Sequence, residues 1–141
     1  MATGKYDSAR GEFARGDIQW KPGGGTFRCF FTTPDYVPSL ANHSMLEDIP
    51  ESARKGTNGS GALADLPLLT VHDPANGWCD ADDLVVTAIP SGVAIDHLII
   101  LEETSPTTGR LIACLGLGAG NVTNGADIDI IWDDTQRIFR L

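Results

Sequence analysis

The second half of the chain is divided into short segments rich in strand-forming residues, and this division constrains the fold most. The segments follow one another through turns that contain Gly, Pro, Asn or Asp, residues that favour tight reversals. No helical segment separates them, so they favour antiparallel neighbours over a parallel sheet, which needs crossover helices. We therefore predict an all-β protein, an antiparallel β-sandwich or jelly roll. The expected strands span residues 66–73, 77–89, 94–103, 110–117, 126–133 and 137–141.

Alternation of side chains within these segments predicts strands with one apolar face and one wetter face. In one segment Ile128, Ile130 and Trp132 alternate with Asp127, Asp129, Ile131 and Asp133. In another, Leu84, Val86 and Ala88 are expected on one face, and Val85, Thr87 and Ile89 on the other. The aromatic residues of the expected strands are interpreted as core residues: Trp20, Phe27, Phe30, Phe31, Trp78, Trp132 and Phe139.

The first half is less regular. Apolar residues at helical spacing predict a short helix over residues 6–15, with Asp7 and Ser8 as candidate caps and Gly16 as its stop. Short strands are expected at 17–20 and 26–33, on either side of a glycine-rich turn. Residues 34–61 read as a long ordered loop with one helical turn near 44–48. We expect an N-terminal arm over 1–16 and a single β-sandwich domain over 17–141.

Length and charge limit the classes of function. The chain has 141 residues, enough for one domain. Its formal net charge of −9, with basic residues scattered singly, excludes nucleic acid as the expected partner. The longest apolar stretches are interrupted by Pro and Gly and are too short to span a membrane. Without a secretory signal at the N-terminus, synthesis in a cytosol is the default expectation.

The residue types that usually carry chemistry form no recognised motif. Cys29, Cys79 and Cys114 lie far apart and are read as buried reduced thiols rather than a disulfide framework or a zinc site. The histidines, His43, His72 and His97, are not accompanied by a nucleophile motif. On a strand, His72 and Asp73, or His97 and Asp96, would point to opposite faces, so neither pair is expected to form a dyad. We predict no catalytic residue and no cofactor.

Two further patterns have competing interpretations. Acidic residues cluster at Asp80, Asp82 and Asp83 and again at Asp127, Asp129, Asp133 and Asp134, where the spacing does not fit an EF-hand. We interpret them as solvent-exposed strand and turn residues and predict no metal site, with calcium at a strand edge as the alternative. The glycines at 116, 118 and 120 follow a strand but precede no helix, so they are read as a bulge or close approach rather than a dinucleotide fingerprint.

Segments in both halves of the chain form a pattern that covers most of its length. In the C-terminal half the segments are 81–92, 94–101, 110–113, 124–133 and 137–141, where a Trp-Asp turn precedes an Ile-Phe-x-Leu strand. In the N-terminal half the match is looser, at 16–20, 26–33, 36–38, His43 and 46–50. With these segments the chain resembles a family of small virion proteins of tailed bacteriophages. The resemblance implies an all-β capsid cement or decoration protein, made in the bacterial cytoplasm and present in the virion. A tail, fibre or receptor-recognition component is the alternative.

The implied partners are the major capsid protein and neighbouring copies of the chain, as a dimer or trimer. Stable contacts usually bury about 1,000 Å² or more, so we expect the segment up to Gly16, the loop 34–61, or both to dock on neighbours. The candidate interface residues are Tyr6, Phe13, Tyr36, Val37, Leu40, Met45 and Leu46. A third hypothesis, a glycan hydrolase, would need two carboxylates about 5 to 10 Å apart in a cleft.

Overall fold

The computed structural model describes residues 3–133 and 138–141 and is mostly β, as predicted. It contains one short helix, α1 (Asp7–Arg15), and four single turns of 3-10 helix, η1 (Leu46–Asp48), η2 (Glu51–Ala53), η3 (Thr57–Gly59) and η4 (Leu63–Asp65). The strands are β1 (Gly4–Lys5), β2 (Thr26–Thr32), β3 (Arg54–Lys55), β4 (Leu68–Leu69), β5 (Trp78–Cys79), β6 (Leu84–Val86), β7 (His97–Ser105), β8 (Thr108–Gly116), β9 (Ile128–Ile130) and β10 (Phe139–Arg140).

A six-stranded antiparallel sheet forms the centre of the molecule. Its strand order is β1-β8-β7-β2-β3, and β4 also pairs with β2. The long strands β7 and β8 form a hairpin in which Ser105 pairs with Thr108, so that two residues make the turn. Two small antiparallel sheets, β6 with β9 and β5 with β10, complete the fold.

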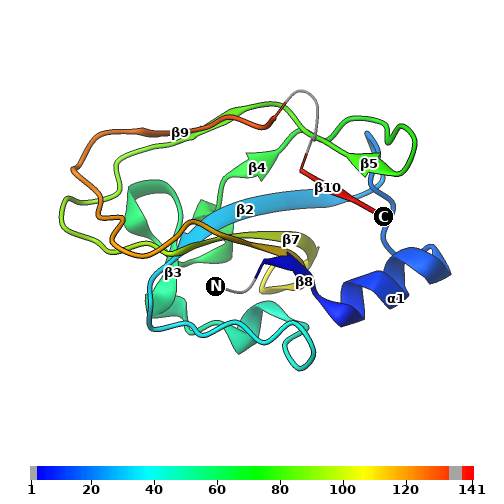
Figure 1. The fold of residues 1–141 in the computed structure, drawn as a ribbon, viewed down its shortest axis with the longest axis horizontal. Helices are drawn as coiled ribbons and strands as arrows, with labels where there is room; N and C mark the ends of the chain where they lie inside the picture. Colours follow the sequence, from blue (N-terminus) through cyan, green and yellow to red (C-terminus); the bar gives the residue numbers. More distant parts are fainter. Residues whose placement is uncertain (1–2, 134–137) are drawn as a thin grey trace.

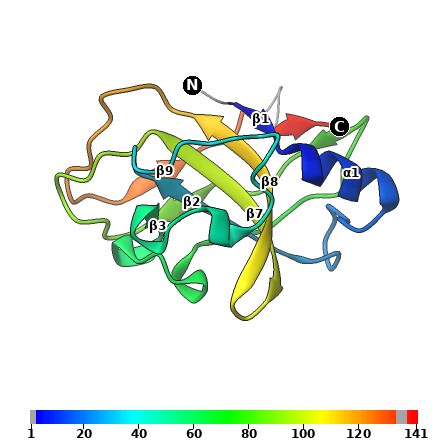
Figure 2. The same ribbon diagram turned by 90° about the horizontal axis from the view of Figure 1, so that it is seen from below.

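Both faces of the central sheet are covered. Figure 1 shows β9 and its neighbours on one side of β2 and β7, and Figure 2 shows the 34–66 segment crossing the other side. Every residue of β7 from His97 to Glu102 is therefore buried, as are Leu111 to Cys114 of β8. The prediction of one wetter face is wrong for these two strands, because the long loop supplies a covering layer.

The same alternation rule succeeds in β9 and fails at the end of β6. Ile130 and Trp132 are buried while Asp129 and Ile131 are exposed, as expected. After Val86, however, Ile89 is also buried although it was expected on the opposite face. Ala88 has a φ of 59°, a left-handed conformation that rotates the chain and changes which side chain points inward.

Several expected strands are shorter than predicted or absent. Residues 17–20 form no strand, although Ile18 and Trp20 are buried. Within the expected strands 66–73 and 77–89, only the short strands β4, β5 and β6 form. Most apolar residues of these segments are buried by tertiary packing rather than by strand pairing. The turn expected at 134–136 lies outside the described residues. The predicted core aromatics are buried except Trp78, which is half-buried, and Trp20 and Trp132 lie outside the strands.

The helix α1 ends where the sequence predicts. Gly16 adopts a left-handed φ of 80° and its amide donates to the carbonyls of Glu12 and Phe13. At the other end Tyr6, rather than Asp7 or Ser8, is the N-cap residue, and it makes no side-chain cap. Since β1 pairs with β8 and Tyr6 and Ala9 are fully buried, the described part of the first 16 residues belongs to the same core as the rest.

The cysteines and the helices are the subject of two predictions from the sequence. Cys29, Cys79 and Cys114 are buried thiols that are not joined by disulfide bonds, as predicted. Burial raises the pKa of Cys29 to about 12 and those of Cys79 and Cys114 to about 11. Among the helices in the described part of the chain, none has the length and apolar composition that crossing a bilayer requires.

Candidate interaction surface

The predicted interface residues divide into buried and exposed groups. Tyr6, Tyr36 and Leu46 are almost completely buried in the protein's own core, so their side chains hold the long loop on the sheet. Phe13, Leu40 and Met45 are half-buried, and only Val37, with 77% of its surface exposed, projects fully into solvent. The structure therefore does not bring these seven residues together as one exposed patch.

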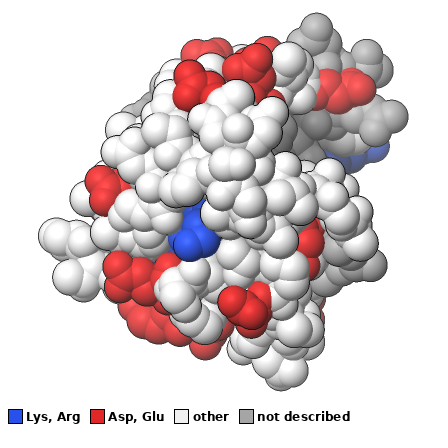
Figure 3. Space-filling model, turned by 90° about the vertical axis from the view of Figure 1, so that its left-hand side faces the viewer, with Lys and Arg blue, Asp and Glu red and all other residues white. Residues whose placement is uncertain are grey.

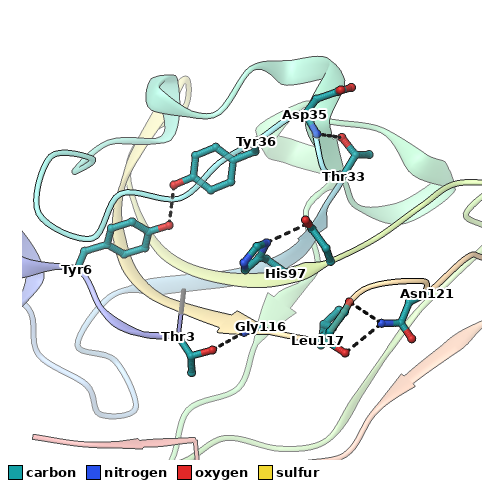
Figure 4. A network of polar contacts seen from close by, with 11 residues as sticks. Thr3, Tyr6, Thr33, Asp35, Tyr36, His97, Gly116, Leu117 and Asn121 are labelled. Carbon is teal, nitrogen blue, oxygen red and sulfur yellow. Dashed lines mark hydrogen bonds and ion pairs between the residues drawn. The ribbon is translucent and has the colours of Figure 1, made fainter. Parts of the chain in front are cut away.

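A hydrogen-bond chain explains the burial of the two tyrosines. The Tyr6 and Tyr36 hydroxyls lie 2.9 Å apart (Figure 4), and the Tyr36 hydroxyl lies 3.0 Å from His43 Nδ1. Because the Ser39 amide already donates to Nδ1, that nitrogen is an acceptor, so Tyr36 donates to His43 and Tyr6 donates to Tyr36. Desolvation raises the pKa of Tyr6 far above its ordinary value and that of Tyr36 to about 12. Both hydroxyls therefore remain protonated, and His43 has a structural partner.

The other two histidines, His72 and His97, lie beside carboxylates. His97 Nδ1 lies 2.9 Å from Asp96 Oδ1 (Figure 4), which corrects the expectation that this pair cannot meet. The reason is that Asp96 precedes β7, so strict strand alternation does not apply to it. His97 is only 4% exposed, so it is not accessible to a substrate in solution. His72 does not pair with Asp73 but lies 2.6 Å from Asp82 on the surface.

Two carboxylates of the acidic clusters, those of Asp83 and Asp127, accept hydrogen bonds from backbone amides. Asp83 accepts the Trp132 amide at 2.8 Å, and Asp127 accepts the Ala88 amide at 3.2 Å. Over residues 3–133 and 138–141, no group of three or more His, Cys, Asp or Glu side chains is arranged to hold a metal ion. Asp83 and Asp127 thus connect the segments that flank β6 to those that flank β9.

Three loops without charged residues meet at one end of the molecule. They comprise residues 56–64, 87–95 and 111–126, of which the last includes the end of β8 and the loop that follows it. The Asn58 amide donates to the Thr87 carbonyl at 2.9 Å, which joins the first loop to the second. We call the exposed surface of these loops the neutral end.

Thr123 holds the second and third loops together. Its side chain is 6% exposed, and its hydroxyl donates to the Pro90 carbonyl at 2.6 Å and accepts the Val93 amide at 2.9 Å. Two backbone hydrogen bonds, from Gly92 to the Thr123 carbonyl and from Thr123 to the Val93 carbonyl, complete the connection. The Asn121 amide group donates to the carbonyls of Leu117 and Gly118 and fixes the turn (Figure 4).

These contacts make the neutral end an ordered surface with small side chains. Gly92, Gly118, Gly120 and Gly125 all have left-handed φ values, so the loop shapes depend on residues without a Cβ. Val122 is the most exposed large apolar residue of the neutral end, at 61%. A surface that is already ordered loses little conformational entropy when a partner binds it.

Charge separates the neutral end from the rest of the surface. Figure 3 shows this end of the molecule as a broad uncharged area with acidic residues around its margin and a small basic patch within it. For a chain with a net charge of −9, this is a face that another protein can approach with little electrostatic repulsion. Sequence reasoning missed the surface, although the absence of charge from 111 to 126 was a visible signal.

Comparisons with known proteins do not identify a family. No family model matches the chain, and neither the curated proteins nor the solved structures include a significant match. The function must therefore be proposed from the molecule itself.

Proposed function

We propose that this chain is a virion structural protein of a tailed bacteriophage, a capsid cement or decoration protein that binds and stabilises the assembled major capsid shell. The proposal includes no catalytic activity. We also propose that the two small sheets form the second layer of a β-sandwich whose first layer is the central sheet. The shell and neighbouring copies of the chain, in a dimer or trimer, are the proposed partners.

The neutral end is the observation that carries this proposal. A protein that binds a preassembled shell in many copies has to stay dispersed beforehand, and a net charge of −9 favours dispersion. It also needs a surface on which contact is not opposed by that charge. The neutral end provides such a surface, ordered by hydrogen bonds between its loops.

A binding experiment tests the proposal with a matched pair of variants. Val122→Glu introduces a charge into the neutral end, whereas Leu68→Glu introduces the same charge on β4, outside the three loops. The two residues are 61% and 59% exposed, so the substitutions disturb the fold to a similar small extent. Purified protein is added to shells assembled from the major capsid protein of the same genome, and co-sedimentation measures the bound fraction.

We expect the unmodified protein and Leu68→Glu to bind equally and Val122→Glu to bind at least about tenfold more weakly, the effect of a charge buried at an interface without a partner. Equal binding by both variants would show that the neutral end is not the contact. Mass spectrometry of purified particles adds a second criterion, because absence of the chain from virions refutes the cement role. Its presence only in isolated tails would favour the tail or fibre alternative.

A further inference from the structure

The strand β9 has one open edge. Within the described part of the chain it pairs only with β6, through Leu84–Ile130, Val85–Asp129 and Val86–Ile128. The Ala88 amide points toward β9, where it meets Asp127, and the Trp132 amide points toward β6, where it meets Asp83. Because strand amides alternate in direction, the amides of Asp129 and Ile131 point away from β6.

The opposite edge of β6 confirms this alternation. The Thr87 carbonyl, which points away from β9, accepts the Asn58 amide. Among the described residues, no group accepts a hydrogen bond from the outward amides of Asp129 and Ile131. A row of unpaired amides and carbonyls on an edge strand is a template for another strand.

An apolar groove of about 400 Å³ lies beside this edge. Its lining includes Leu98 and Leu115 of the central sheet. On the side of β9 it is lined by the consecutive residues Ile128, Asp129, Ile130, Ile131 and Trp132. A strand added to β9 would place every second side chain toward this groove.

The outer face of the same edge is acidic. Asp127 and Asp129 are exposed and alternate with Ile128, which is half-buried, and Ile130, which is buried. The chain has no Lys or Arg from residue 111 to 136, so no basic residue within this segment balances them. Side chains on the outer face of an added strand would lie beside these carboxylates, where Lys or Arg is favoured.

We propose that the open edge of β9 is a strand-addition site for an extended segment of another protein in which apolar residues alternate with Lys or Arg. The apolar residues enter the groove, the basic residues lie beside Asp127 and Asp129, and the backbone pairs with Asp129 and Ile131. A second copy of this chain does not fit this description, because its sequence contains no two Lys or Arg residues at positions i and i+2. The groove borders the neutral end, since Leu115 belongs to both. The site still goes beyond the proposed function, because the strand edge that it uses is β9, which lies outside the three uncharged loops.

The experiment uses a fluorescent seven-residue peptide in which Lys and Val alternate, and anisotropy measures its binding to the full chain. One control peptide replaces Lys with Glu, and another has the same composition with its lysines grouped together. Asp129→Asn removes one carboxylate, and Asp129→Pro also removes an outward amide from an edge where proline is tolerated. Val85→Pro is the matched control, because it removes an outward amide from the opposite edge of the same two-stranded sheet.

We expect saturable binding of the alternating peptide that weakens as NaCl is raised, since exposed charge pairs are screened. Asp129→Asn should weaken it by up to about fivefold, and Asp129→Pro by about tenfold or more. Val85→Pro should change it by less than about twofold, within the range of surface substitutions. Thermal unfolding of each variant establishes that it is folded, and Asp129→Asn serves as the test if Asp129→Pro is not.

Several results would overturn the proposal. No binding of the alternating peptide at concentrations up to about 1 mM would exclude the site. Equal binding of the Glu or the grouped peptide would exclude the stated partner chemistry. Dimerisation that Asp129→Asn abolishes would make a second copy the occupant instead. None of these results depends on whether shells bind the neutral end, so the two proposals can fail separately.

Discussion

Replacement of Arg110 by Met should destabilise the protein in a strongly pH-dependent way. Arg110 lies on β8 between two carboxylates. Its Nη1 donates to Glu12 at 2.6 Å, and its Nε lies 2.9 Å from Glu102, an ion-pair distance without the alignment of a hydrogen bond. The side chains of Arg110, Glu12 and Glu102 are 24%, 15% and 7% exposed. The network is thus mostly screened from water, and removal of the cation leaves two carboxylates together.

The magnitude follows from this burial. Breaking a buried ion pair by removing one partner costs about 3–5 kcal/mol. Because Arg110 is partly exposed, we expect a loss of about 2–4 kcal/mol in the free energy of unfolding at pH 7. This is a large fraction of the 5–15 kcal/mol that is typical of a whole domain.

The pH dependence follows from Glu102. Desolvation by burial raises the pKa of Glu102, while Arg110 acts to lower it. A raised pKa means that the folded state binds the proton more tightly than the unfolded state does. The resulting stabilisation is present in acid and is lost as the pH rises through the raised pKa. Without Arg110 the pKa of Glu102 rises further, so the deficit of the variant should shrink as the pH falls from 7 toward about 4.

Urea unfolding at both pH values measures this effect. Arg15→Met is the control, because Arg15 pairs with Asp17 at the exposed surface and should cost no more than about 1 kcal/mol. Equal losses for the two variants, or a deficit of Arg110→Met that grows in acid, would refute the reasoning.

Three further predictions concern buried groups and a backbone position. Native protein at pH 8 should resist a thiol reagent until it unfolds, because all three cysteines are buried with raised pKa values; rapid labelling of the folded state would contradict this. Tyr36→Phe removes the buried hydrogen bonds that the Tyr36 hydroxyl makes with Tyr6 and His43 and should lower the free energy of unfolding in urea by about 1–3 kcal/mol, whereas an unchanged midpoint would show that the hydrogen-bond chain contributes nothing. Gly16→Ala should lower stability by about 1 kcal/mol by calorimetry, because φ is 80° although the Cβ would meet no atom; a stabilised variant would refute the strain argument.

The sequence carried enough information to predict the local structure where the signal is local. Gly16 ends α1, and the alternation of Ile130 and Trp132 with aspartate places β9 correctly, since each depends on neighbours along the chain. The prediction for β7 failed because its second covering layer comes from residues 34–66, which lie far away in sequence. Alternation cannot show that an ordered loop will cover a strand.

The candidate site was harder to predict for the same reason. Tyr6 and Tyr36 are predicted interface residues because the N-terminal segment and the loop 34–61 are expected to dock on neighbours, but their hydroxyls bond to each other and to His43 inside the protein. The neutral end depends on Thr123, whose hydrogen bonds to Pro90 and Val93 join segments about thirty residues apart in the chain. Such a surface exists only after the loops have been brought together.

The most direct test of the central claim is a cryo-electron microscopy difference map between shells with and without the bound protein. The neutral end is predicted to face the shell, with the loops 56–64, 87–95 and 111–126 at the contact and the acidic surface exposed to solvent. Contact through the acidic surface, or the absence of any added density on the shell, would contradict the account.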